Sequence, residues 1–214
     1  GDFADTAKKL ASMERSGEII RLKRGLYVVD ASDFGFPPSL PICSNHIYGP
    51  SYVSLQWALS FYGLIPEHVY SITAVTVKRS REFNNTLGRF TYMQVPEEYF
   101  HIGISTTMND GANFLIATRE KALCDMILAD PYVPNLSIIA LKRYLEEDLR
   151  LDTDELADFD IEIIRQCAEC GRKNSTLTNL IKIVNHLSIE FKMLCIHIHY
   201  LFSLSYVFII IDNL

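Results

Sequence analysis

The first 29 residues contain the feature that most constrains the fold, a helix followed by a hairpin with a basic tip. Residues 6–15 form the expected helix, and Gly17 can adopt the positive φ that ends it. Strand-forming residues then lie on both sides of Lys23, Arg24 and Gly25, which is a hairpin signal. A helix that leads into a basic hairpin is typical of the second half of a winged helix-turn-helix, a DNA-binding module. These residues leave one alternative open, a surface hairpin whose lysines and arginines are solvated.

The DNA-binding interpretation assigns a role to each basic group. A helix in the major groove would present side chains from one face, and four residues have the spacing to share it: Lys8, Lys9, Ser12 and Arg15. The hairpin would place three cations on phosphates: Arg21, Lys23 and Arg24. A second basic group would either extend the DNA footprint or be a solvated strand end: Lys78, Arg79 and Arg81.

Charge and cysteine content narrow the class of protein. The chain of 214 residues has a net charge of -6, so the whole molecule is not a general polyanion binder. Residues 1–29 hold six Lys or Arg and four Asp or Glu, which favours DNA contact by the N-terminal region. The five cysteines are scattered and odd in number, which indicates reduced thiols in a cytoplasmic protein. No pattern of residues indicates a metal site, a cofactor or a catalytic centre.

The rest of the chain predicts an α+β fold. We expect a partial winged helix in residues 1–30, a linker in 31–46 and a second domain in 47–185. Three prolines in the linker, Pro37, Pro38 and Pro41, disfavour both helices and central strands. The second domain is expected to begin with a helix at 51–62 and to continue with antiparallel strands at 70–78, 89–95, 100–106 and 113–117. Helices are expected at 118–130, 136–148, 153–170 and 175–190.

Residues 186–214 form an apolar tail that allows three interpretations. The stretch 193–211 has no formal charge and approaches the length of a membrane span. However, two histidines, two serines and a cysteine dilute its hydrophobicity. A packed terminal helix or strand, or a segment added beyond the natural domain, is therefore favoured over a weak membrane anchor, and we expect no membrane association.

Four motifs in order resemble the AbiEi family of antitoxin-type transcriptional regulators, over roughly residues 5–183. The segment Tyr48–Glu67 (YGPSYVSLQWALSFYGLIPE) resembles the start of the family's C-terminal domain. RFTYMQVP at 89–96, with FHIG at 100–103, is similar to its strand pair. ATREKALCD at 117–125 is similar to its A-x-x-E-K-A-L-x-D helix, and RLKRGLY at 21–27 to its wing.

The resemblance implies a winged-helix protein that binds promoter double-stranded DNA and represses its own toxin–antitoxin operon. The implied functional partner is a nucleotidyltransferase-like toxin that forms no stable direct complex with the antitoxin. The chain departs from the family in two places: the first helices of the winged helix are absent, and the apolar tail has no counterpart.

Two alternative functions use other residues. A nuclease-like or nucleotide-processing enzyme would need an acid–lysine set, for which Asp110, Glu120, Lys121 and Asp125 are the candidates. Against it, Glu120 and Lys121 are adjacent at an expected helix start, so they point in different directions. A protein-interaction module would expose an aromatic patch of Trp57, Phe61 and Tyr62, although burial of one helix face explains the same residues.

Overall fold

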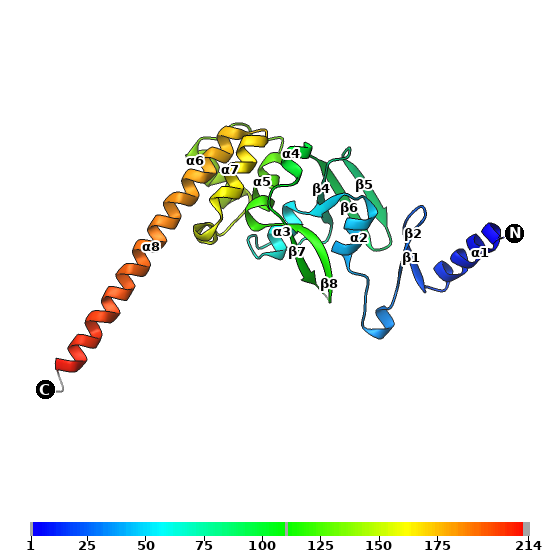
Figure 1. The fold of residues 1–214 in the computed structure, drawn as a ribbon, viewed down its shortest axis with the longest axis horizontal. Helices are drawn as coiled ribbons and strands as arrows, with labels where there is room; N and C mark the ends of the chain where they lie inside the picture. The colour runs from blue at the N-terminus through cyan, green and yellow to red at the C-terminus, as the bar shows by residue number, and fades with distance from the viewer. Residues whose placement is uncertain (1, 110, 212–214) are drawn as a thin grey trace.

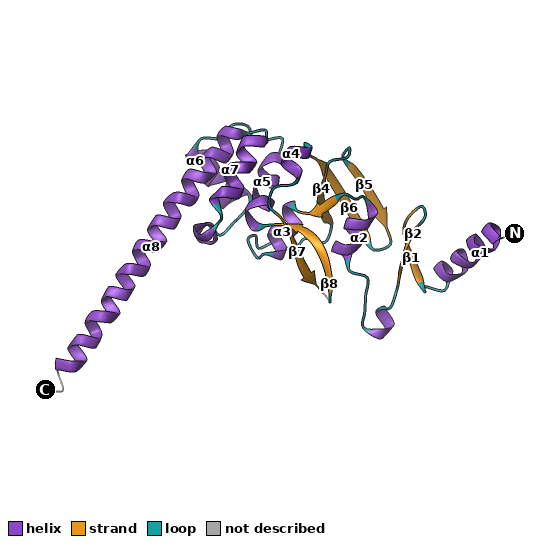
Figure 2. Ribbon diagram, viewed as in Figure 1, coloured by secondary structure: helices purple, strands orange, loops and turns teal. Residues whose placement is uncertain are grey.

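The computed structural model describes residues 2–109 and 111–211, which form an N-terminal arm, a central mixed sheet with helices, and a long C-terminal helix (Figures 1 and 2). This is the expected α+β class. The arm contains helix α1 (Asp2–Arg15), strands β1 (Ile19–Lys23) and β2 (Leu26–Val29), and the 3₁₀ turn η1 (Ser32–Phe34).

The expected helix and hairpin of the arm are both present. Gly17 follows α1 with a φ of 79°, and Gly25 forms the hairpin turn with a φ of 78°. Strands β1 and β2 are antiparallel, with Ile19 opposite Val29. These two glycines allow the chain to reverse where a side chain would be strained. The local sequence was therefore sufficient to predict the helix and the hairpin of the arm.

The expectation of an unstructured linker at 31–46 is wrong, because residues Leu40–Ile47 form helix α2. Pro41 lies in the first turn of α2, where the amide hydrogen that proline lacks would have no partner in the helix. Cys43 and Ile47 are buried against the sheet. The proline that disfavoured a helix in the sequence in fact lies near its start.

The central sheet has six strands in the order β5-β6-β4-β3-β8-β7. Their bounds are β3 (Ser51–Val53), β4 (Ile72–Thr76), β5 (Arg81–Asn85), β6 (Gly88–Gln94), β7 (Ile104–Asn109) and β8 (Ala112–Ala117). The sheet is mixed, because β3 runs parallel to β8 and β4 runs parallel to β6. The expected all-antiparallel arrangement is therefore wrong for these two pairs.

Two element boundaries and one additional strand in the sheet region also differ from the expectation. Residues Ser51–Val53, expected as the start of a helix, form β3, and the helix α3 spans only Leu55–Phe61. Residues Glu97–Phe100 form the short helix α4, so the expected strand at 100–106 begins at Ile104 instead. Strand β5 was not expected, because its sequence REFNN is polar.

Helices cover both faces of the sheet. Helix α2 lies on one face, where the Tyr92 hydroxyl donates to the Ser44 carbonyl at 2.7 Å. Helix α3 lies on the other face, where the Trp57 amide donates to Thr73 Oγ1 at 3.2 Å. Helix α5 (Arg119–Ala129) packs against α3 and is capped by Thr118, as expected. One hydrophobic core results, and it includes Leu22 of the hairpin.

The remaining helical segments form a second layer around α5. They are α6 (Ile138–Arg143), the π-helical turn η2 (Tyr144–Asp148), the 3₁₀ turn η3 (Thr153–Asp158), α7 (Ile161–Cys170) and α8 (Asn174–Ile211). The single helix expected at 153–170 is interrupted, because the Asp160 side chain accepts from the Glu162 amide and starts α7 anew.

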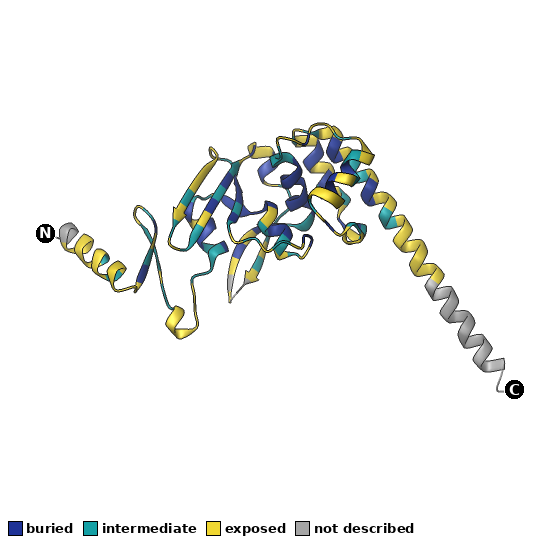
Figure 3. Ribbon diagram, turned by 180° about the vertical axis from the view of Figure 1, so that it is seen from behind, coloured by how far each residue is buried: buried dark blue, intermediate teal, exposed yellow. Residues whose placement is uncertain are grey.

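Helix α8 leaves the body part-way along its length (Figures 1 and 3). Its first turns are buried against α7, η3 and α6, whereas Ile189 and Phe191 are 62% and 58% exposed. A packed tail is therefore wrong for residues 189–197, and the side chains of 198–214 lie outside the described part. Among the residues whose side chains the structure describes, which end in α8 at His197, no helix combines the length and apolar character that crossing a membrane requires.

Candidate nucleic-acid interface

Helix α1 projects from the body with its polar side chains exposed (Figures 1 and 3). The side chains of Lys8, Lys9, Ser12 and Arg15 are all exposed. Lys8, Ser12 and Arg15 are spaced by four and three residues, so they share one face of the helix, and Lys9 lies about 100° further round. The Arg15 Nε–H donates to the Ala11 carbonyl at 3.1 Å, which holds this guanidinium at the end of the helix.

The hairpin, in contrast, is fixed to the body. Leu22 is 5% exposed and belongs to the main core. The Asn85 side-chain amide of β5 donates to the Leu22 carbonyl at 3.1 Å. Lys23 Nζ donates to the Ile47 carbonyl at 2.6 Å, at the last residue of α2. These contacts orient the hairpin tip relative to the sheet.

The second basic group meets the hairpin at the same place. Lys78 Nζ donates to the Gly49 carbonyl at 2.5 Å and lies 5.4 Å from the centre of the Tyr48 ring. The carbonyls of Ile47 and Gly49 are two residues apart, so they are separated by at most about 7 Å. A helix C-terminus carries partial negative charge, and both ammonium groups lie beside it. The structure therefore brings together two basic groups that are 55 positions apart in the sequence.

We call the combined surface of both groups the basic strip: Arg21, Lys23, Arg24, Lys78, Arg79 and Arg81. Its two bonded lysines act as anchors, a role that the sequence did not indicate. The guanidinium groups of Arg21, Arg24 and Arg79 are exposed, and that of Arg81 lies 4.9 Å from the centre of the Phe83 ring. Phe83 packs against Tyr48, with ring centres 5.5 Å apart, so neighbouring rings support Lys78 and Arg81.

The residues of the enzyme alternative lie inside the protein. Lys121 and Asp125 have fully buried side chains and form an ion pair of 3.1 Å within α5. Glu120 is also buried and accepts from the Asp160 amide at 3.1 Å. Asp110 lies outside the described residues. Within the part of the chain that the structure describes, no three His, Cys, Asp or Glu side chains form a group that could hold a metal ion.

The aromatic residues of α3 are only partly buried. Trp57 and Phe61 stack with ring centres 5.4 Å apart, and Phe61 remains 39% exposed. The Tyr62 hydroxyl donates to the Ala117 carbonyl at 2.9 Å, which fixes this ring against β8. The expectation that burial of one helix face accounts for these aromatic residues is therefore wrong for Phe61, and the buried residues of this helix are Leu55, Ala58 and Leu59.

No protein-family model and no curated protein matches this chain.

Proposed function

We propose that this protein is a DNA-binding transcriptional regulator that contacts promoter DNA through α1 and the basic strip. The observation that carries the proposal is the convergence of the hairpin and the Lys78–Arg81 group on the Ile47–Gly49 segment. A single surface with several guanidinium groups can follow a phosphate backbone, because each guanidinium offers a planar set of donors.

Helix α1 supplies the part that would enter a groove. Its 14 residues span about 21 Å, and its exposed polar face is held away from the sheet. The major groove of B-DNA is wide enough to admit such a helix. Arg15 and Ser12 are suited to base edges, whereas Arg21 and Arg24 are suited to phosphates.

The AbiEi resemblance gives the proposal its biological setting. In that setting the protein represses its own toxin–antitoxin operon in the cytoplasm, and a nucleotidyltransferase-like toxin is its functional partner without a stable complex. In this proposal the protein acts by binding DNA and has no catalytic site of its own. The burial of Lys121 and Asp125, two candidate residues of the enzyme alternative, supports it.

The test is binding of the full chain to DNA from upstream of its own gene, measured by fluorescence anisotropy over a range of salt concentrations. We expect the double variants Arg21→Ala with Arg24→Ala, and Arg79→Ala with Arg81→Ala, to weaken binding to all sequences. Each lost phosphate contact should lower the log–log salt slope by about 0.9. A control of equal charge change, Arg165→Ala with Arg172→Ala, lies on the helical layer and should leave the slope unchanged.

The same assay separates base contacts from phosphate contacts. Ser12→Ala or Arg15→Ala should cost about 1–3 kcal/mol at particular base pairs and leave non-specific binding nearly intact. Absence of DNA binding, or a salt slope that no basic-strip variant changes, would contradict the proposed function.

A further inference from the structure

The two edges of the central sheet differ in how they are protected. At one edge, β5 carries Arg81 and Glu82, and the N-terminal hairpin lies against it. At the other edge, β7 (ISTTMN) contains no charged residue and no proline. Its pairing with β8 is regular from Ile104–Ala117 to Asn109–Ala112, without a bulge. Charges, prolines, bulges and covering segments are the usual means by which an edge strand avoids further pairing, and β7 has none of them among the described residues.

The backbone groups that β7 presents outward can be identified from its register. The Gly103 carbonyl accepts from the Thr118 amide at 2.8 Å, so these two residues occupy a hydrogen-bonded position of the antiparallel pair. Hydrogen-bonded and non-hydrogen-bonded pairs alternate in antiparallel strands, so Ser105 and Thr107 also bond to β8. The N–H and C=O groups of Ile104, Thr106 and Met108 therefore point away from the sheet.

We propose that β7 pairs antiparallel with β7 of a second copy of this chain, about a twofold axis at Thr106. In this register Thr106 lies opposite Thr106 of the second copy, and Ile104 lies opposite Met108 of the second copy. Each of these three pairs consists of outward-pointing residues, so each forms two backbone hydrogen bonds. Threonine pairs and apolar pairs at opposing positions both stabilise a sheet. The sequence is thus complementary to itself in the register that pairs all three outward-pointing residues, whereas registers shifted by two or more residues pair fewer of them.

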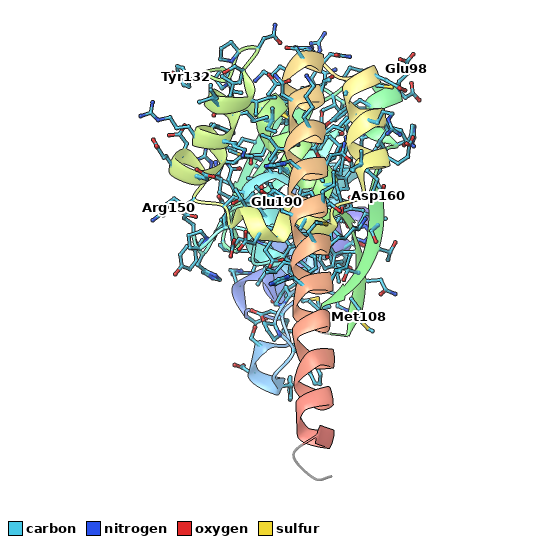
Figure 4. All side chains as sticks on the ribbon, turned by 90° about the vertical axis from the view of Figure 1, so that its left-hand side faces the viewer. Glu98, Met108, Tyr132, Arg150, Asp160 and Glu190 are labelled. Atoms are coloured by element: carbon cyan, nitrogen blue, oxygen red, sulfur yellow. The ribbon has the colours of Figure 1, made fainter. Side chains whose placement is uncertain are left out.

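Side-chain exposure and charge both favour a second copy as the occupant. Met108 is 66% exposed and lies at the outer margin of the molecule (Figure 4). Leu115, on β8 opposite Thr106, is 42% exposed on the same face, so the exposed apolar surface at this edge extends over both strands of the hairpin. No position of β7 or β8 is charged, so twofold pairing brings no like charges together although the chain has a net charge of -6. An oppositely charged partner would find no complementary charge on this edge.

The first experiment is sedimentation of the full chain at up to about 100 µM, a concentration at which pairs with micromolar dissociation constants are fully formed. We expect a dimer, and we expect Thr106→Lys to raise its dissociation constant at least about tenfold, because the charge opposes its own copy across the axis. Thr86→Lys, at the exposed β5–β6 turn, is the matched control and should leave the dimer intact. Circular dichroism would show that both variants remain folded.

The second experiment tests the register by cysteine crosslinking in a chain with Cys170→Ser and Cys195→Ser, which removes the exposed thiols. Thr106→Cys should give a disulfide-linked dimer on mild oxidation, because opposing Cα atoms at about 5.5 Å permit the bond. Thr107→Cys is displaced by roughly 7 Å along the strand from its own copy, so it should crosslink poorly. A monomer at all concentrations, equal crosslinking of both variants, or a dimer that only removal of residues 189–214 abolishes would overturn the proposal.

Discussion

Helix α1 of the N-terminal arm and helix α5 place their lysines in opposite surroundings. Lys121 of α5 is fully buried: its ammonium group lies 3.1 Å from Asp125 Oδ1 and donates to the Tyr99 carbonyl at 3.0 Å. Lys8 and Lys9 of α1 are exposed on a helix that projects from the body. The surroundings, and not the residue type, decide whether a charge supports the fold or is accessible to a partner.

The physical reason is the cost of removing a charge from water. A buried ammonium group is tolerated only where a counter-charge and hydrogen-bond acceptors replace its hydration. Beside α5 the second oxygen of Asp125 accepts from Ser54 Oγ at 2.6 Å, so one carboxylate oxygen is hydrogen-bonded and the other forms the ion pair with Lys121. This network joins α5 to the start of α3. The exposed lysines of α1 need no such network, and their charge remains available to an anionic ligand.

The largest effect expected from this comparison follows from removing one buried charge. Lys121→Met should lower the free energy of unfolding by about 3–5 kcal/mol, because Asp125 would remain buried without its counter-charge. Lys8→Met, the same change on α1, should alter it by less than about 0.5 kcal/mol. Urea denaturation followed by circular dichroism measures both.

A double variant sharpens this prediction. Lys121→Met with Asp125→Leu removes both charges, so it should be less destabilised than Lys121→Met alone. If Lys121→Met proved as stable as Lys8→Met, the buried pair would not stabilise the fold and the contrast between the two regions would fail.

The next effect concerns a buried hydroxyl in the body. Burial raises the pKa of Tyr92 to about 12, and its hydroxyl donates to the Ser44 carbonyl. In the unfolded chain the same group releases its proton near pH 10, so alkaline solution favours unfolding. The contribution of Tyr92 is fully present below pH 10 and should be lost at roughly 1.4 kcal/mol per pH unit between about pH 10 and 12. Thermal unfolding across that range would measure it.

The matched variants isolate this contribution from that of other tyrosines. Tyr92→Phe loses one hydrogen bond, worth about 1 kcal/mol at neutral pH, but lacks the alkaline loss, so its deficit relative to the original chain should shrink above pH 10. Tyr132→Phe, at a side chain that is 91% exposed, should follow the original chain throughout. A Tyr92→Phe deficit that stays constant with pH would show that this hydroxyl titrates normally in the folded protein.

The sequence predicted the helices and turns that are determined by residues close to them in the chain. Gly17 and Gly25 specify the ends of α1 and the hairpin turn, and the Thr118 hydroxyl accepts from the Lys121 amide to begin α5. The elements it missed depend on distant partners. Strand β3 is three residues long and becomes a strand by pairing with β4 and with Ile116 of β8. No local signal encodes such pairing.

The candidate site shows the same limit. The sequence indicated both basic groups, and the structure places them on one surface. The two groups meet at the C-terminal end of α2. The sequence did not predict this helix, because prolines such as Pro41 disfavour helices in most positions. Without α2, the bond of Lys23 to its last carbonyl, at Ile47, and the bond of Lys78 to Gly49, two residues further on, could not have been expected. Which cations anchor the strip and which remain exposed is therefore information that only tertiary structure supplies.

The smallest effect is expected at the C-terminus, where one helix crosses from the body into an exposed segment. Leu177, Leu180, Ile183 and Val184 are buried, and among the side chains of α8 that the structure describes Leu187 is the last one that packs against the core. Ending the chain after Ser188 should therefore change the free energy of unfolding by less than about 0.5 kcal/mol, because the residues removed make no core contact in the described part. Thermal unfolding should remain a single cooperative transition. The shortened chain should also aggregate less, because it no longer exposes Ile189 and the apolar residues that follow.

A shorter chain provides the contrast within the same helix. Ending it after Asn179 removes Leu180, Ile183 and Val184, and each buried aliphatic side chain contributes about 1.5–3 kcal/mol. This variant should lose most of its cooperative unfolding, since α7 and η3 would lose the helix that covers them. If the chain ending at Ser188 also lost cooperativity, the exposed segment would belong to the folded unit, through contacts made in solution by a second copy. A dimer that persists in the chain ending at Ser188 would instead leave β7 as the interface and α8 beyond Ser188 as dispensable.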